Sequence, residues 1–147
     1  MALLVDTRVW SLLLRRDSPP DLPEVTALRG ALGGDGIVAT TGVVVQELLH
    51  GFVSASAQAA IKETFGALEY LAPTFDDHVE AAGVRNQLRS SGIQLGAIDA
   101  VIAQLAIAGS HTLLTTDKDF HLAARHVGLR VWQAPPGGSS TRSQGLL

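Results

Sequence analysis

The chain has 147 residues, of which 46% are hydrophobic and 17% are charged, and this length suits one compact domain with its own core. It contains no cysteine, which excludes disulfides, thiolate metal sites and a cysteine nucleophile, so any metal ion would need oxygen or imidazole ligands. The formal net charge of −3 argues mildly against a protein that binds nucleic acid by bulk charge.

The first expected element is an apolar strand at residues 2–5, followed by a helix that includes residues 10–14. Asp6 and Arg8 interrupt this start too early for a secretory signal. No apolar run in the chain approaches the ~20 residues needed to cross a bilayer, so a cytoplasmic protein is expected.

Strands and helices then alternate along the chain. Two prolines predict a loop at 17–20, Thr41 and Gly51 bracket a helix, and a helix that Thr74 or Asp76 caps ends before Gly92. The remaining expected elements are helices at 22–32, 56–68, 96–109 and about 119–127, and strands at 37–40, 69–72, 113–116 and 129–132. The helix at 96–109 is the most apolar, which predicts burial on most sides.

This alternation predicts an α/β fold with a central parallel sheet of about four to five strands and helices on both faces. We expect a single domain over residues 1–134. Residues 135–147 are rich in Gly, Pro and Ser and are expected to form a flexible tail.

Four acids are candidates for chemistry, and each has a simpler explanation. Asp6 and Asp117 follow apolar strands, where an aspartate often caps the next helix, and Glu47 could emerge on the solvent side of its helix. Asp99 is harder to explain in this way, because Ile102 and neighbouring residues at helical spacing are apolar. A buried carboxylate without a partner costs several kcal/mol.

Taken together, the four acids indicate a shared site. Asp6 and Asp117 stand at carboxyl ends of strands, and Glu47 and Asp99 stand near helix starts, so all four could converge at one edge of the sheet. Carboxylates crowd together only if they are protonated or share cations. Oxygen ligands without thiolates point to Mg²⁺ or Mn²⁺, which suit phosphate chemistry.

The order of these motifs resembles that of PIN-domain ribonucleases. They are Asp6-Thr7 after the first strand, Glu47 in Val-Val-Val-Gln-Glu-Leu, Ile98-Asp99-Ala100, and Thr115-Thr116-Asp117-Lys118-Asp119-Phe120. The resemblance spans Leu3 to Trp132. Because the chain is small, it is most similar to the VapC toxins of bacterial type II toxin–antitoxin modules.

This resemblance implies a Mg²⁺-dependent endoribonuclease that cleaves structured RNA such as transfer or ribosomal RNA. Asp6, Glu47, Asp99 and Asp117 would form the catalytic cluster, with Asp6, Asp99 and Asp117 as metal ligands. Asp119 would be a supporting acid, and Thr7 and Thr116 would orient ligands or water. It also implies a small cognate antitoxin, a homodimer, and heterotetramers or larger assemblies with the antitoxin.

Four basic residues are candidates for RNA or antitoxin contacts. Arg8 could reach a substrate phosphate, although a solvated arginine is the simpler interpretation. Arg85 and Arg89 lie one helical turn apart and could form a basic ridge, and Lys118 lies between two of the acids. We expect His50 and His78 to lie on the surface rather than to bind a metal, and Trp10 and Trp132 to lie in the core rather than to stack on RNA bases.

Two other functions compete with the ribonuclease. A phosphatase of the haloacid dehalogenase kind also places an aspartate after its first strand, but it needs a second aspartate where this chain has Arg8. A non-catalytic relative could use the same acids to bind metal or RNA. For the toxin, apolar residues in excess of one core predict an antitoxin groove formed by Leu12, Leu13, Val43, Val44, Leu48, Leu49 and Phe52.

Overall fold

Twelve elements follow one another in the computed structural model, which describes residues 2–15, 21–34 and 36–136. Nearly every expected element forms, with ends that differ by a few residues. The strands are β1 Leu3–Val5, β2 Val38–Thr40, β3 Glu69–Tyr70, β4 Thr112–Leu114 and β5 Arg130–Val131. The helices are α1 Thr7–Leu14, α2 Pro23–Gly33, α3 Gly42–Gly51, α4 Ala55–Gly66, α5 Phe75–Ser90, α6 Ala97–Ala108 and α7 Lys118–Ala123.

The five strands form one sheet in the order β3-β2-β1-β4-β5, and every neighbouring pair is parallel. The expected parallel sheet is therefore confirmed. From β1 the chain moves outward to β2 and β3 and then crosses back to β4 on the other side of β1. Crossovers between parallel strands are almost always right-handed, so this change of direction predicts the helices of the two halves on opposite faces of the sheet.

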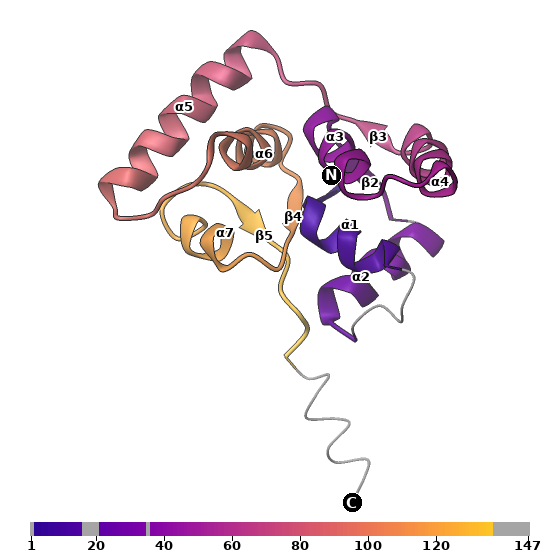
Figure 1. Ribbon diagram of the computed structural model, residues 1–147. Coiled ribbons are helices and arrows are strands. Elements are labelled where there is room, and N and C mark those ends of the chain that lie inside the picture. Colours follow the sequence, from indigo (N-terminus) through magenta and orange to yellow (C-terminus); the bar gives the residue numbers. More distant parts are fainter. Residues whose placement is uncertain (1, 16–20, 35, 137–147) are drawn as a thin grey trace, which may run out of the picture.

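Two helical layers cover the sheet, as Figure 1 shows. Helices α1 to α4 lie on one side, where α1 contacts α2 and α3, and α3 contacts α4. On the other side lie α5, α6 and α7, and α5 packs along α6. The strands are added on one side of β1 as far as β3 and on the other side from β4 onward. The sheet therefore has its topological switch point between β1 and β4, which is where open α/β sheets bind ligands.

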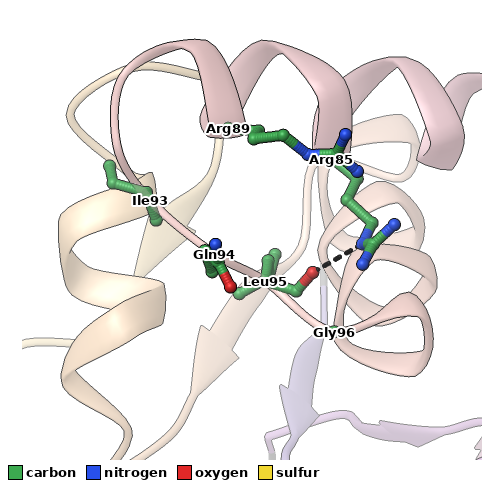
Figure 2. Close-up of a pocket in the computed structure, with 6 residues that line it drawn as sticks. All are labelled: Arg85, Arg89, Ile93, Gln94, Leu95 and Gly96. Carbon is green, nitrogen blue, oxygen red and sulfur yellow. Dashed lines mark hydrogen bonds between the residues drawn. The ribbon is translucent and has the colours of Figure 1, made fainter.

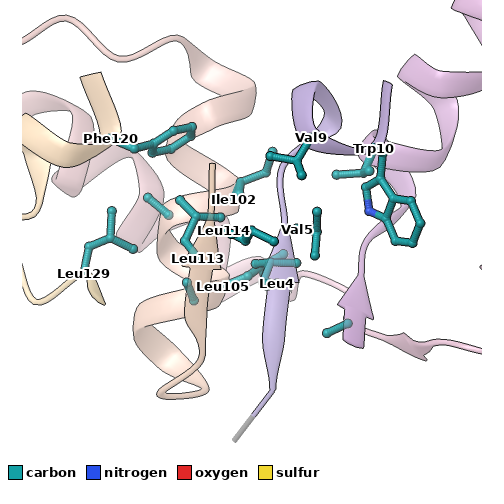
Figure 3. Close-up of a cluster of buried hydrophobic side chains, with 14 of the residues drawn as sticks. Leu4, Val5, Val9, Trp10, Ile102, Leu105, Leu113, Leu114, Phe120 and Leu129 are labelled. Carbon is teal, nitrogen blue, oxygen red and sulfur yellow. The ribbon is translucent and has the colours of Figure 1, made fainter. Parts of the chain in front are cut away.

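The core lies on both faces of the two central strands. Leu4 and Leu113 are paired in the register of β1 and β4 and are fully buried. Phe120 and Trp10 flank these strands on opposite sides (Figure 3), and both rings are inaccessible to solvent. Trp10 packs against Phe65 with ring centroids 4.5 Å apart. The expected core position of Trp10 is thus confirmed.

Local signals account for several helix ends. Thr74, rather than Asp76, caps α5 by a reciprocal pair of hydrogen bonds with Asp77. Gly92 has a positive φ of 81°, which suits the glycine stop expected after α5. Helix α7 ends earlier than the expected 119–127. After Ala123 the backbone forms turns with hydrogen bonds between residues three apart, such as the one that Arg125 N donates to Leu122 O.

The expected antitoxin groove needs correction, and the expected C-terminal tail lies almost wholly beyond the residues that the structure describes. Val44 and Leu48, which were expected in an antitoxin groove, are at most 1% exposed and belong to the core. Both side chains lie in the same buried cluster as residues of β1 and β2, so they are not available to a partner. The expected tail at 135–147 falls almost wholly outside the described residues. Within those residues, every helix is too short or too polar to span a membrane.

Candidate active site

The switch point brings together two acids that are 111 residues apart in sequence order, Asp6 and Asp117. Asp6 follows β1 directly, and its backbone N–H donates to Leu114 O at 2.9 Å, so it continues the pairing of β1 with β4. Asp117 comes three residues after β4 and is the N-cap of α7. Since neighbouring parallel strands end at the same edge, both carboxyls reach one place.

Asp6 is only 5% exposed and stands at the N-cap position of α1, yet its side chain makes no capping hydrogen bond. Its Oδ2 instead accepts a hydrogen bond of 2.9 Å from Thr115 Oγ1. Burial raises the pKa of Asp6, against the opposing effects of the Thr115 hydroxyl and the positive charge of Arg8. Helix capping therefore does not explain this aspartate.

Asp117 does cap its helix, and it has a second partner as well. Its Oδ1 accepts a hydrogen bond of 2.9 Å from Asp119 N, and its Oδ2 lies 3.1 Å from Arg8 Nη1. The Asp117 side chain is 10% exposed and that of Arg8 is 62% exposed, so the Arg8 guanidinium approaches the carboxylate from the solvent side. An exposed ion pair of this kind contributes little stability, about 0 to 1 kcal/mol.

Thr115 ties the two aspartates together from a fully buried position. Its hydroxyl donates to Asp6 and accepts a hydrogen bond of 3.0 Å from Asp117 N. A single side chain thus sets the orientation of one carboxylate and the backbone that carries the other. Thr116, for which the family resemblance implies a supporting role, is exposed, and Thr115 rather than Thr116 makes these two contacts.

Asp99 lies in the first turn of α6 and is half-buried. No described residue forms a hydrogen bond or ion pair with it. Its pKa is raised to about 6, first by burial and then by the negative charges of Asp6 and Asp117; the positive charge of Arg8 opposes this rise in part, and Glu47 adds a smaller increase. The four acids therefore act on one another electrostatically, as the sequence predicts for a shared site.

Glu47 stands on α3 at the rim of this group and is exposed. Its Oε1 accepts a hydrogen bond of 2.7 Å from Thr7 Oγ1, the residue that begins α1. This contact joins the two helices that carry the first and second acids. Glu47 is thus oriented by Thr7 while its carboxylate remains open to solvent.

A divalent cation fits this site by its chemistry, since oxygen donors and mutual repulsion are what Mg²⁺ or Mn²⁺ would satisfy. As the side chains stand, no three Asp, Glu or His residues in the described part of the chain are grouped closely enough to hold one ion. Thr115, Arg8 and Thr7 each contact one of the other three carboxylates, whereas Asp99 has no hydrogen bond or ion pair with a described residue.

The remaining sequence-predicted residues lie at different distances from the acids. Lys118 is exposed beside Asp117, and Asp119 is partly buried and bonds to Asp117 through its backbone. Arg85 and Arg89 lie on α5, where they line a cavity of about 480 Å³ with the segment 93–96 (Figure 2). His50 and His78 are exposed, as expected, and Trp132 is partly buried against the core.

Comparison with known proteins places these features in a family context. A family model described as the PIN domain matches residues 3–126, which is most of the chain. No curated protein matches the sequence.

Several solved structures share the fold at low identity. A chain of VapBC2 from Rickettsia felis, bound to a fragment of promoter DNA, has a TM-score of 0.67 and 21% identity over 90% of this chain and 98% of its own. VapBC-1 from nontypeable Haemophilus influenzae gives 0.69 and 19%, covering 90% and 98%. VapC20 from Mycobacterium tuberculosis, described as a sarcin-ricin loop cleaving toxin, gives 0.64 and 22%, covering 88% and 99%.

Proposed function

The chain belongs to the PIN-domain family, and on that premise we propose that it is a Mg²⁺- or Mn²⁺-dependent endoribonuclease, the toxin of a type II toxin–antitoxin module. Its substrate would be structured RNA, such as transfer or ribosomal RNA, cut by attack of water on a phosphodiester. The observation that carries this proposal is the half-buried Asp99: the negative charges of Asp6 and Asp117 repel its carboxylate, Arg8 offsets them only in part, and no described residue forms a hydrogen bond or ion pair with it.

In this proposal Asp6, Asp99 and Asp117 hold the cation, and Glu47 is the fourth catalytic acid. When bound, the cation would polarise a phosphoryl oxygen and lower the pKa of the attacking water. Glu47, exposed and oriented by Thr7, would accept the proton that this water loses. Asp119 helps to hold Asp117 at the start of α7, and Thr116 remains a proposed supporting residue at the exposed rim.

Partners follow from the same proposal. The solved relatives include toxin–antitoxin complexes, and a small antitoxin would place a basic residue among the acids and an apolar segment nearby. A cavity of about 250 Å³ offers room for such a segment; it is lined by Leu14, Phe52, Ser56, Ala57, Ala60 and Ile61. We also propose that the toxin forms a homodimer, that it joins the antitoxin in a heterotetramer or larger complex, and that it acts in the cytoplasm.

A non-catalytic metal- or RNA-binding relative is the second candidate. It is favoured by the ion pair between Arg8 and Asp117, which places a positive charge where a metal would otherwise act. The phosphatase alternative gains no such support. The position two residues after Asp6 holds this same arginine, and the family is a different one.

The test is a cleavage assay with the purified protein and labelled transfer or ribosomal RNA, with Mn²⁺ or with EDTA. We expect cleavage only with the metal, and a loss of at least about a hundredfold in D6N and D99N, since even outer-shell changes at metal sites cost about 10–100-fold. Asp76→Asn, an exposed change on α5, is the control. Sequencing of the RNA ends would identify the cut.

Each outcome assigns the protein to one of the candidates. If D6N and D99N both cleave as well as the unmodified protein, the proposed site is wrong. If the unmodified protein binds RNA and Mn²⁺ but does not cleave, the non-catalytic candidate replaces the nuclease.

A further inference from the structure

A second charged feature lies beside the acids, on the last two turns of α5. Arg85 projects toward the segment 93–96, which leads from α5 into α6, and Arg89 extends along α5 toward Arg85 (Figure 2). Arg85 Nε donates a hydrogen bond of 2.9 Å to Leu95 O, which fixes the guanidinium against this segment. Together they enclose a cavity of about 480 Å³ that Ile93, Gln94 and Gly96 also line.

The positive charge of this cavity is not neutralised by the protein. Within the described ranges 2–15, 21–34 and 36–136, no carboxylate lies within salt-bridge distance of either arginine, and Arg89 makes no hydrogen bond to another described residue. Like charges one helical turn apart repel each other. A bound anion would remove this repulsion and occupy the free nitrogens.

The cavity borders the part of the acidic site that Asp99 forms. Gly96 lines the cavity and is also the N-cap of α6, whose first turn carries Asp99. A Cβ atom placed on Gly96 would lie 4.0 Å from Asp99 Oδ2. Because α5 and α6 pack along each other, the packing of these two helices sets the separation between the arginines and Asp99.

We propose that this cavity binds a backbone phosphate of the RNA strand, next to the phosphate that is cut. The inference rests on the proposed nuclease function and adds a binding subsite to it. A ligand that spans both features must present an anion to the arginines and another anionic group that a cation can bridge to the acids. A phosphodiester chain has this repeating charge, and the planar guanidinium matches phosphate oxygens with two parallel hydrogen bonds.

The experiment measures binding apart from cleavage. A short fluorescein-labelled oligoribonucleotide of random sequence is titrated with the protein in EDTA, and fluorescence anisotropy gives the affinity at several NaCl concentrations. For single strands, each phosphate contact contributes about 0.7 to the slope of log affinity against log salt. We expect Arg89→Gln to weaken binding several-fold and to lower that slope by about 0.7.

Two controls separate the subsite from general charge. Arg89→Lys keeps a charge that can meet a phosphate and should keep the slope of the unmodified protein. Arg29→Gln removes the same charge from an exposed position on α2, on the opposite helical layer, and should change neither affinity nor slope. Thermal melting of each variant confirms that it is folded.

The inference is overturned if Arg89→Gln and Arg85→Gln both leave affinity and slope unchanged, or if the unmodified protein does not bind the RNA. It is also overturned if an acidic polyglutamate peptide, or inorganic phosphate at equal phosphate concentration, competes as well as unlabelled RNA. Cleavage in Mn²⁺ by the unmodified protein is scored separately. If the unmodified protein does not cleave RNA but Arg89→Gln still lowers the salt slope, the nuclease function is rejected, whereas RNA binding at this cavity is supported.

Discussion

Replacing Asp99 with asparagine should make the protein more stable at neutral pH, although it removes a proposed metal ligand. Asparagine has nearly the same shape as aspartate but carries no charge. In the folded chain the carboxylate of Asp99 is half-buried and is repelled by Asp6 and Asp117, so its removal relieves both effects. A functional site that stores destabilising charge in this way is expected to lose activity as it gains stability.

The size of the effect follows from the pKa of Asp99. A rise from 3.8 to about 6 corresponds to about 3 kcal/mol, because each pKa unit is worth about 1.4 kcal/mol. Since the side chain is in part exposed, solvent and salt screen this value, and we expect about 1 to 2 kcal/mol. For a protein of this length, that gain raises Tm by about 3 to 6 °C.

The pH dependence has a definite sign. In the unfolded chain Asp99 ionises near its ordinary pKa of 3.8, whereas in the folded protein it stays protonated up to about pH 6. The folded state therefore binds more protons between these values, and this group makes the protein less stable as pH rises through that window. The full penalty is present above about pH 6 and is absent below pH 3.8.

Thermal and urea unfolding, followed by circular dichroism in EDTA at low salt, measure this difference. We expect Asp99→Asn to be more stable than the unmodified protein at pH 7.5 and equally stable near pH 4. Glu80→Gln, the same charge change at an exposed position of α5, should show no comparable gain. Added Mn²⁺ should stabilise the unmodified protein more than the variant. An equal gain at both pH values, or none at pH 7.5, would refute the electrostatic reasoning.

Three further changes test other parts of the structure. Thr115→Val removes the hydroxyl that is hydrogen-bonded to both aspartates, and we expect it to lower the free energy of unfolding in urea by about 1 to 3 kcal/mol. The control, Thr116→Val at the exposed neighbouring position, should change this free energy by less than about 0.5 kcal/mol. Arg8→Gln frees a carboxylate oxygen and should strengthen Mn²⁺ binding by less than about tenfold in calorimetric titration; weaker binding would show that the arginine does not compete with the metal. Gly92→Ala should cost about 1 kcal/mol in thermal unfolding because of its positive φ, whereas Gly83→Ala, inside α5 with open space around it, should stabilise by about 0.5 to 1 kcal/mol; the opposite order would contradict this explanation.

Much of the fold could be predicted from local patterns alone. Apolar runs, threonine caps and glycine stops are short-range features, and they gave the alternation of strands and helices that specifies a parallel sheet. The helix Ala97–Ala108 shows this well, since its continuous apolar character predicted the burial that the structure shows for its central residues. The same patterns placed Asp6 and Asp117 at carboxyl ends of strands.

The tertiary structure alone decided which of these residues meet. An aspartate after a strand fits a helix cap and a metal ligand equally well, and only the pairing of β1 with β4 shows that Thr115 engages Asp6 while Asp117 also meets Arg8. Strand order depends on contacts between distant segments and on the handedness of the crossovers, neither of which leaves a local signal. For that reason the sequence by itself determined the elements and the candidate acids, whereas the neighbours of each acid, and the basic cavity beside Asp99, come from the packing of segments far apart in the chain.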